Sequence, residues 1–212
     1  MSYAVFLTGF EPTVDLSDSV ALLADLRRAL LELRAIPPPP SGQVSGANGT
    51  PFIYMRCTSR VVLQPFESIR AFHDMLLQSC GVRSRMPRLL KLAEPVYAKE
   101  HRLCFTHSDL HTRNILVKDG RLAGIIDWET AGWFPEYWEY TMLEIRAILN
   151  VQGWQIFWDA VGVFGTQYQK ELELERALCY STGDMAVMPE IKNHELMARL
   201  GHGSSHDFSP AR

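Results

Sequence analysis

Apolar residues recur every three or four positions along several stretches of the chain, and this spacing predicts amphipathic helices. The clearest stretch follows Ser17 and Asp18, either of which can cap a helix, and it stops at the prolines of residues 37–40. Its apolar positions share one face of a helix: Val20, Leu23, Leu26, Leu30 and Leu33. We therefore expect a long helix near the start of the chain, with its charged residues facing water.

The same spacing predicts further helices, and short apolar runs predict strands. Helices are expected over residues 67–77, 136–149, 154–163, 169–180 and 190–200, with a weaker pattern over 87–103. Pro135 suits the first turn of the helix over 136–149. Strands are expected at residues 3–7, 52–54, 115–117 and 121–126, the last two joined through Asp119 and Gly120, a hairpin signal. The pattern indicates an α+β fold that is mostly helical and carries a short β-hairpin.

Two segments have the composition of loops. Residues 37–51 are rich in proline and glycine, with Gly42, Gly46 and Gly49 close together. A glycine-rich loop can hold phosphates, but this segment follows a proline break rather than a strand, so we interpret it as a linker. Residues 201–212 are rich in glycine, serine and histidine and are expected to be a disordered tail.

Polar side chains with catalytic potential lie between short apolar runs in the middle of the chain. His107 and Asp109 stand in a tight polar segment, and Asn114 opens the first strand of the predicted hairpin. The return strand ends at Asp127, 13 positions after Asn114 (127 − 114 = 13). The hairpin is therefore expected to carry Asp127 back toward Asp109 and Asn114.

This arrangement suits phosphoryl transfer from a nucleotide. Residues 107–114 fit the kinase catalytic-loop pattern H-x-D-L-x-x-x-N, which is followed by a metal-binding carboxylate. Asp109 would orient an acceptor hydroxyl and take its proton. Asn114 and Asp127 would offer the oxygen ligands that Mg²⁺ prefers. The hypothesis is an ATP-dependent, Mg²⁺-dependent phosphotransferase.

Simpler interpretations exist for each of these residues. Asp109 can cap a loop, and Asn114 and Asp127 can be ordinary residues at strand ends. His107 is expected to hydrogen-bond the backbone near Asp127, while Arg113 could steady either a phosphate or Asp109. A zinc site at His107 and His111 lacks further ligands at suitable spacing.

Aromatic and acidic residues gather after Asp127. The aromatic set is expected to pack in the core, with a wall for the acceptor as the alternative: Trp128, Trp133, Phe134, Tyr137 and Trp138. The acidic set is expected to be a solvated helix face, with a site for a cationic acceptor as the alternative: Glu129, Glu136, Glu139 and Glu144.

Residues 107–117, 124–129 and 132–140, together with 33–37, resemble the aminoglycoside phosphotransferase-like kinases, and particularly their fungal branch. The resemblance covers about residues 15 to 180, with Thr112 standing where the family often has proline. It implies a protein-kinase-like fold, with Asp109 as catalytic base, Asn114 and Asp127 as magnesium ligands, and ATP and a small-molecule hydroxyl as substrates.

The resemblance also implies a division of the chain. The first lysine is Lys91, so no strand-borne lysine precedes the segment 33–37. We expect residues 1–16 to hold an interlobe hinge strand and residues 17–200 to form the kinase-like C-terminal lobe, with the N-terminal lobe largely absent. The rival hypothesis is a truncated, catalytically inactive lobe that acts as a binding module.

Composition narrows the choice of partners. The 212 residues carry a formal charge of −3, which gives no basic footprint for nucleic acid. No apolar run is long enough to span a bilayer, and the first residues do not resemble a secretory signal. Four scattered cysteines favour reduced thiols. We expect a soluble cytoplasmic protein with a small-molecule substrate and no membrane partner.

Overall fold

The computed structural model describes residues 5–6, 19–56, 59–150, 154–164 and 167–181. It is a mixed α+β structure in which helices make up about half of the described residues. The helices are α1 (Val20–Ala35), α2 (Ile69–Gln78), α3 (Met86–Tyr97), α4 (Trp138–Asn150), α5 (Trp154–Val161) and α6 (Gln169–Ser181). Short 3₁₀ turns that lie wholly within the described residues are η2 (Arg83–Arg85), η3 (Thr112–Asn114) and η4 (Trp128–Thr130).

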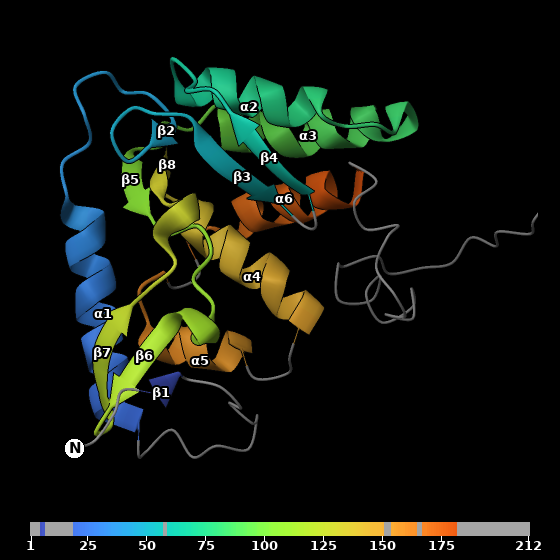
Figure 1. The fold of residues 1–212 in the computed structure, drawn as a ribbon. Helices are drawn as coiled ribbons and strands as arrows, with labels where there is room; N and C mark the ends of the chain where they lie inside the picture. Colours follow the sequence, from blue (N-terminus) through green and yellow to red (C-terminus); the bar gives the residue numbers. More distant parts are fainter. Residues whose placement is uncertain (1–4, 7–18, 57–58, 151–153, 165–166, 182–212) are drawn as a thin grey trace, which may run out of the picture.

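The strands form three small antiparallel sheets. They are β1 (Val5–Phe6), β2 (Ser45–Gly46), β3 (Phe52–Arg56), β4 (Ser59–Leu63), β5 (Leu103–Thr106), β6 (Ile115–Lys118), β7 (Arg121–Ile125) and β8 (Gly132–Pro135). One sheet has the order β1-β6-β7, the second β2-β8-β5, and β3 pairs with β4 alone. Helix α1 packs against β5 of the second sheet and β7 of the first, and so joins the two (Figure 1).

Most predicted helices and the hairpin are present, with ends shifted by a few residues. The hairpin of β6 and β7 pairs Ile115 with Ile125 and Lys118 with Arg121. The predicted first strand is found at Val5 and Phe6, where it pairs with Leu116 and Val117 of β6. The helix expected over 190–200 and the tail expected over 201–212 lie outside the described residues.

The sequence analysis missed strands that pair over long distances. Pro135 ends strand β8 opposite Leu103 rather than opening a helix, because β5 provides a pairing partner that the local pattern does not reveal. A proline is tolerated at such a strand end, where its missing amide costs no ladder hydrogen bond. The segment 37–51 is likewise more than a linker, since Ser45 and Gly46 pair with Trp133 and Gly132.

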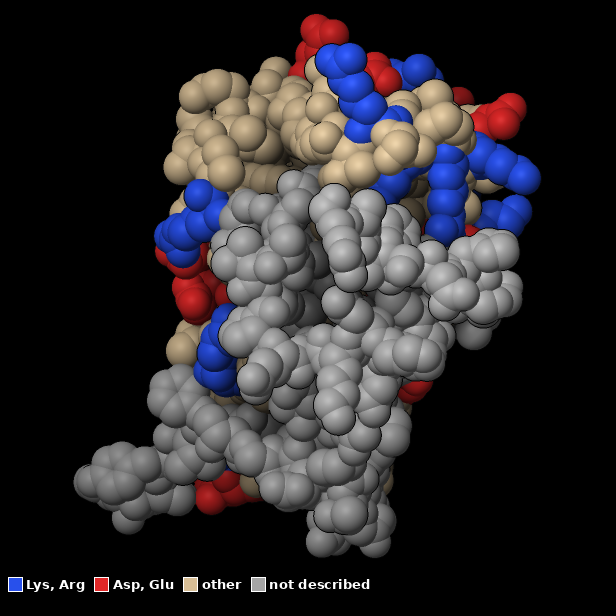
Figure 2. Space-filling view, turned by 90° about the vertical axis from the view of Figure 1, so that its right-hand side faces the viewer, with Lys and Arg blue, Asp and Glu red and all other residues tan. Residues whose placement is uncertain are grey.

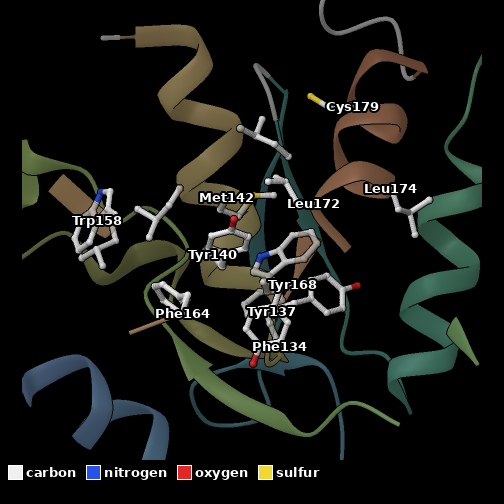
Figure 3. Close-up of a cluster of buried hydrophobic side chains, with 14 of the residues drawn as sticks. Phe134, Tyr137, Tyr140, Met142, Trp158, Phe164, Tyr168, Leu172, Leu174 and Cys179 are labelled. Atoms are coloured by element: carbon white, nitrogen blue, oxygen red, sulfur yellow. The ribbon is translucent and has the colours of Figure 1, made fainter. Parts of the chain in front are cut away.

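Aromatic side chains fill the core between the hairpin β3–β4 and helices α2 and α4. The Phe72 ring meets Trp138 at a centroid distance of 5.1 Å, and Phe134 stacks on Trp138 at 5.5 Å. On the other side of α4, Tyr140 points toward Phe164 and Tyr168 (Figure 3). Of the predicted aromatic set, Trp133, Phe134, Tyr137 and Trp138 are buried, whereas Trp128 is 40% exposed.

The cysteines differ in state. Cys80 and Cys104 are buried free thiols, as expected. Cys179 is disulfide-bonded, so the expectation of reduced thiols is wrong there. Spacing along the chain does not reveal which cysteines the fold brings together.

Charges of both signs lie on the surface, and the described helices are of ordinary length. On the face drawn in Figure 2, acidic and basic side chains lie interspersed along the upper rim rather than in a patch of one sign. Among the residues that the structure describes, no helix combines the length and the apolar character needed to cross a bilayer.

Gly132 allows β2 to lie against β8. A Cβ atom at this position would stand 2.3 Å from the backbone oxygen of Ser45 and 3.2 Å from the Cα of Gly46. Both neighbours are backbone atoms of the paired strand, so the strands would have to separate. The sheet that leads into residues 107–109 therefore depends on this glycine.

We expect Gly132→Ala to lower the free energy of unfolding by about 1–3 kcal/mol, the usual cost of forcing extra atoms into a packed site. Gly124→Ala is the matched control, because an added Cβ there meets nothing within 4 Å. Urea denaturation of both variants measures the difference. Equal stability of the two variants would contradict the close approach.

Asp25 fastens α1 to the hairpin β6–β7. Its carboxylate accepts hydrogen bonds from Arg121 Nε at 2.6 Å and Nη2 at 2.8 Å, and from the Leu122 amide at 3.3 Å. The Arg121 guanidinium lowers the pKa of Asp25 to about 2 from a usual 3.8. Because the pKa is lowered by folding, this stabilisation is present above about pH 4 and is lost as the pH falls toward 2.

We expect Asp25→Asn to lower Tm by several degrees at neutral pH, with the difference from the unmodified protein shrinking as the pH falls from about 4 to about 2. Asp74→Asn removes the exposed Arg70–Asp74 pair of α2 and serves as the control. Circular dichroism melts across this pH range provide the measurement. A difference that stays constant down to pH 2 would show that the ionised pair is not its source.

Candidate functional site

Strand β5 delivers the chain into a tight loop at residues 107–109, and His107 ties this loop to the end of the hairpin. The His107 Nε2 lies 2.8 Å from the backbone oxygen of Ile126, the residue before Asp127. The Asp109 amide donates to His107 Nδ1 at 3.3 Å, so Nε2 carries the proton and donates to Ile126. This is the kind of contact that the sequence analysis expected of His107.

Glu139 of α4 holds the backbone of the same loop. Its carboxylate accepts hydrogen bonds from the His107 amide at 2.5 Å and from the Ser108 amide at 3.1 and 3.2 Å. Burial raises the pKa of the Glu139 carboxyl, while the nearby His107 ring and the two amides oppose that rise. A carboxylate buried in this way orders two successive peptide groups.

Ser108 adopts a left-handed backbone conformation, with φ of 67°, which is uncommon for a residue other than glycine. Its hydroxyl accepts a hydrogen bond from Trp138 Nε1 at 2.9 Å. Glu139 thus holds the loop through two backbone amides, and Trp138, the residue before it in α4, holds the loop through the Ser108 side chain. These contacts fix the direction in which Asp109 leaves the loop.

The Asp109 carboxylate is buried and paired with Arg113. Arg113 Nη2 lies 3.1 Å from one carboxylate oxygen and 3.4 Å from the other. The Arg113 side chain is 51% exposed, whereas that of Asp109 is 5% exposed. The guanidinium therefore lies on the solvent side of the carboxylate.

Asn114 joins the loop to the hairpin. Its side-chain nitrogen donates to the Asp109 backbone oxygen at 2.8 Å, and its own backbone oxygen accepts from the Ile126 amide at 2.9 Å. Fixing the amide nitrogen in this way leaves Oδ1 as the side-chain atom able to bind a ligand. Asp127 follows directly after Ile126.

Asp127 has a left-handed backbone, with φ of 65° and ψ of 58°, and is exposed. Within the described part of the chain its carboxylate has no hydrogen-bond or ion-pair partner. The structure therefore brings the loop carrying Asp109, the Asn114 amide and the strand end carrying Asp127 together through direct backbone contacts.

The site offers few protein ligands to a metal. No group of three or more His, Cys, Asp or Glu side chains able to hold an ion occurs among the described residues. Mg²⁺ commonly uses only one or two carboxylates and takes its other ligands from water and phosphates. The oxygen donors of Asn114 and Asp127 therefore fit Mg²⁺ bound together with a nucleotide.

His111 is not placed as a partner of His107 in a zinc site. Its Nδ1 accepts a hydrogen bond from the Arg113 amide at 3.2 Å, which closes the η3 turn. Burial, with the Arg113 charge, lowers the pKa of His111 to about 4. The ring is therefore neutral at physiological pH and shapes the turn.

The acidic set does not form a solvated helix face. Glu139 and Glu144 are buried, the former at the loop and the latter 3.5 Å from Arg176. Glu136 pairs with Arg102 at 3.1 Å, and Glu129 pairs with Arg60 of β4. Each of these carboxylates is thus paired with groups of the protein itself, and only Glu129 belongs to a pair with both partners exposed.

Glu139 is the site residue that the sequence analysis misread, because it was grouped with exposed acids. One signal was available: in a helix over 136–149, Glu139 falls on the same face as Met142 and Leu143, and all three are buried. An acid on an apolar helix face requires a partner, and the loop amides provide it.

We expect Glu139→Gln to lower the free energy of unfolding by about 1–3 kcal/mol, since glutamine replaces two charged acceptor oxygens by one neutral oxygen and brings an NH₂ donor against the loop amides. Hydrogen exchange at His107 and Ser108 should accelerate. Glu144→Gln, a second buried acid of α4, should destabilise the protein without selectively exposing these two amides. Unchanged exchange in Glu139→Gln would contradict the loop-holding role.

Comparison with known proteins gives a family. The chain matches the phosphotransferase enzyme family over residues 3–147, which is more than half of its length and includes the loop, the hairpin and Asp127. No curated protein matches the chain. The match spans β1 to most of α4 and so includes the loop contacts of Glu139 and Asn114. The chain belongs to the phosphotransferase enzyme family.

Proposed function

We propose that this protein transfers the γ-phosphoryl group of ATP to a hydroxyl group of a small molecule. The observation that carries the proposal is the pair of backbone contacts made by Asn114, to Asp109 and to Ile126. Through these contacts, Asn114 links the backbone of Asp109, the expected base, to Ile126, the residue directly before Asp127, the expected metal ligand. Family membership supports the reaction class.

Asp109 is assigned as the residue that orients the acceptor hydroxyl and receives its proton. As the acceptor oxygen forms its bond to the γ-phosphorus, the bond between that phosphorus and the bridging oxygen of ADP breaks. The products are ADP and a phosphate monoester, with the acceptor proton passing to Asp109 and then to water. The loop contacts of Glu139 hold the Asp109 backbone in place for this task.

Arg113 has to move for this chemistry to occur. In the structure its guanidinium covers the Asp109 carboxylate from the solvent side. The Arg113 side chain is half exposed, so water can solvate its guanidinium when an incoming substrate takes its place at Asp109. The displaced guanidinium would then be free to contact a phosphate. Arg113 would therefore play both roles considered from the sequence, first at Asp109 and then at a phosphate.

Asn114 Oδ1 and the Asp127 carboxylate are assigned as the ligands of Mg²⁺. Both are hard oxygen donors, and neither is engaged by another described side chain. The bound ion would neutralise charge on the nucleotide phosphates. The left-handed backbone at Asp127 turns the chain sharply into η4 directly after this carboxylate.

We further propose that residues 17–200 correspond to the C-terminal lobe of a protein-kinase-like fold, of the fungal aminoglycoside phosphotransferase type, with a hinge strand within residues 1–16. The position of β1 beside the β6–β7 hairpin supports this assignment. The proposed acceptor is a small molecule rather than a nucleic acid. A cytoplasmic location is part of the same proposal.

We expect Asp109→Asn to lower kcat by about 10²- to 10⁴-fold, the range for loss of a catalytic base, with little change in nucleotide affinity. Asp127→Asn should instead abolish the Mg²⁺ dependence of nucleotide binding. A screen of hydroxyl acceptors with radiolabelled ATP gives the rates, and calorimetric titration gives the affinities. Asp74→Asn on α2 is the control.

Turnover that survives Asp109→Asn unchanged would refute the assignment of the base. Absence of nucleotide binding at millimolar ATP and Mg²⁺ would refute the phosphotransferase proposal as a whole. That second result would favour the rival interpretation, a catalytically inactive kinase-like lobe that acts as a binding module.

A further inference from the structure

The hairpin of β3 and β4 brings an arginine to the segment that follows Asp127. Strand β3 lies against η4. Arg60 of β4 donates from Nη1 to Glu129 Oε1 at 2.6 Å and from Nη2 to Glu129 Oε2 at 2.8 Å. Glu129 is only two positions after Asp127, although Arg60 is 69 positions away in the chain.

The Arg60–Glu129 pair is open to solvent. The Arg60 side chain is 53% exposed and the Glu129 side chain is 43% exposed. Exposed ion pairs contribute little to stability because water solvates both charges well. The Glu129 carboxylate thus positions the Arg60 guanidinium without binding it tightly. A more highly charged anion can therefore replace Glu129 as the partner of Arg60.

Arg60 is also close enough to Asp127 to feel its charge. The hydrogen bonds of Glu129 are the main cause that raises the pKa of Arg60, and the Asp127 carboxylate adds to the rise. Both guanidinium Nη atoms are nevertheless engaged by Glu129 rather than by Asp127. Glu129, two positions after Asp127, therefore holds the cation where the Asp127 charge still acts on it, while both Nη atoms are paired with Glu129 itself.

We propose that Arg60 is a phosphate-binding residue, which leaves Glu129 and donates to oxygens of the transferred phosphoryl group when the nucleotide binds at Asp127. The inference rests on the proposed function and adds a residue to its site. The planar guanidinium can donate to two phosphoryl oxygens at once, as it now does to the two oxygens of Glu129. Charge spreads over these phosphoryl oxygens during transfer, so a cation there stabilises the transition state.

A purely structural role makes a different prediction. If the pair only clips the hairpin onto η4, then removal of either partner has the same consequence. If Arg60 binds phosphate, the two removals have opposite effects. Arg60→Gln removes the phosphate ligand, whereas Glu129→Gln releases Arg60 and removes a negative charge near the nucleotide.

The experiment compares the affinities of MgADP and of a Mg²⁺ complex with a non-hydrolysable ATP analogue, by calorimetric titration of the full chain. We expect Arg60→Gln to weaken the analogue by about 10- to 100-fold, as for loss of one or two charge-assisted hydrogen bonds, and MgADP much less. Glu129→Gln should bind the analogue more tightly. Arg70→Gln, which breaks the exposed Arg70–Asp74 pair of α2, is the matched control.

Two results would overturn the inference. One is equal weakening of the analogue and of MgADP, or no weakening, in Arg60→Gln. The other is weakening in Glu129→Gln of the same size as in Arg60→Gln, which indicates a structural clip. Tm values of the variants reveal any loss of folding, and the ratio of the two nucleotide affinities is unaffected by a reduced folded fraction.

Failure of the proposed function is separable from failure of this inference. Absence of binding of either nucleotide to the unmodified protein refutes the proposed function, and the inference with it, before any substitution is made. Binding and turnover in the unmodified protein, with no selective effect of Arg60→Gln, refutes the inference alone.

Discussion

The structure around the loop at residues 107–109 depends on one buried carboxylate. Glu139 accepts hydrogen bonds from two successive amides, those of His107 and Ser108. Burying a carboxylate is costly unless hydrogen bonds replace its water, and here the loop amides do so. The loop is stabilised as well, because without Glu139 the same two amides would be buried without hydrogen-bond acceptors. Helix α4 and the loop therefore stabilise each other through a single side chain.

A second set of contacts extends this order to the hairpin. His107 reaches the backbone of Ile126, and Asn114 reaches the backbones of Asp109 and Ile126. The polar atoms of the loop are thus used to fix the hairpin, at whose ends Asn114 is buried and Asp127 is exposed. Asp25 and Arg121 anchor the opposite end of the same hairpin to α1.

Local patterns predicted what local interactions determine. The helices and the hairpin at Asp119 and Gly120 follow from spacing and turn chemistry, and those that fall within the described residues are present. Strands β2, β5 and β8 were missed, because they are short and pair with segments that are distant in the chain. Strand β4 was also missed, although its partner β3 directly precedes it. The loop motif directed attention to Asp109, Asn114 and Asp127. The motif itself does not include Glu139 or Arg60. The helical pattern after residue 136 gave a signal for Glu139, whereas Arg60 is recognised only when the β3–β4 hairpin is placed beside the motif.

Ser108 shows how two demands are balanced at one position of the loop. Its left-handed backbone would be easiest for glycine, which has no side chain to strain. Glycine would also forfeit the hydroxyl that receives the indole N–H of Trp138. Serine at this position therefore costs backbone conformational free energy but gains a hydrogen bond to Trp138 of α4. A lineage that passed through glycine at this position would have a less strained but more mobile loop, because the hydrogen bond to Trp138 would be lost. The amide of residue 108 would still donate to Glu139.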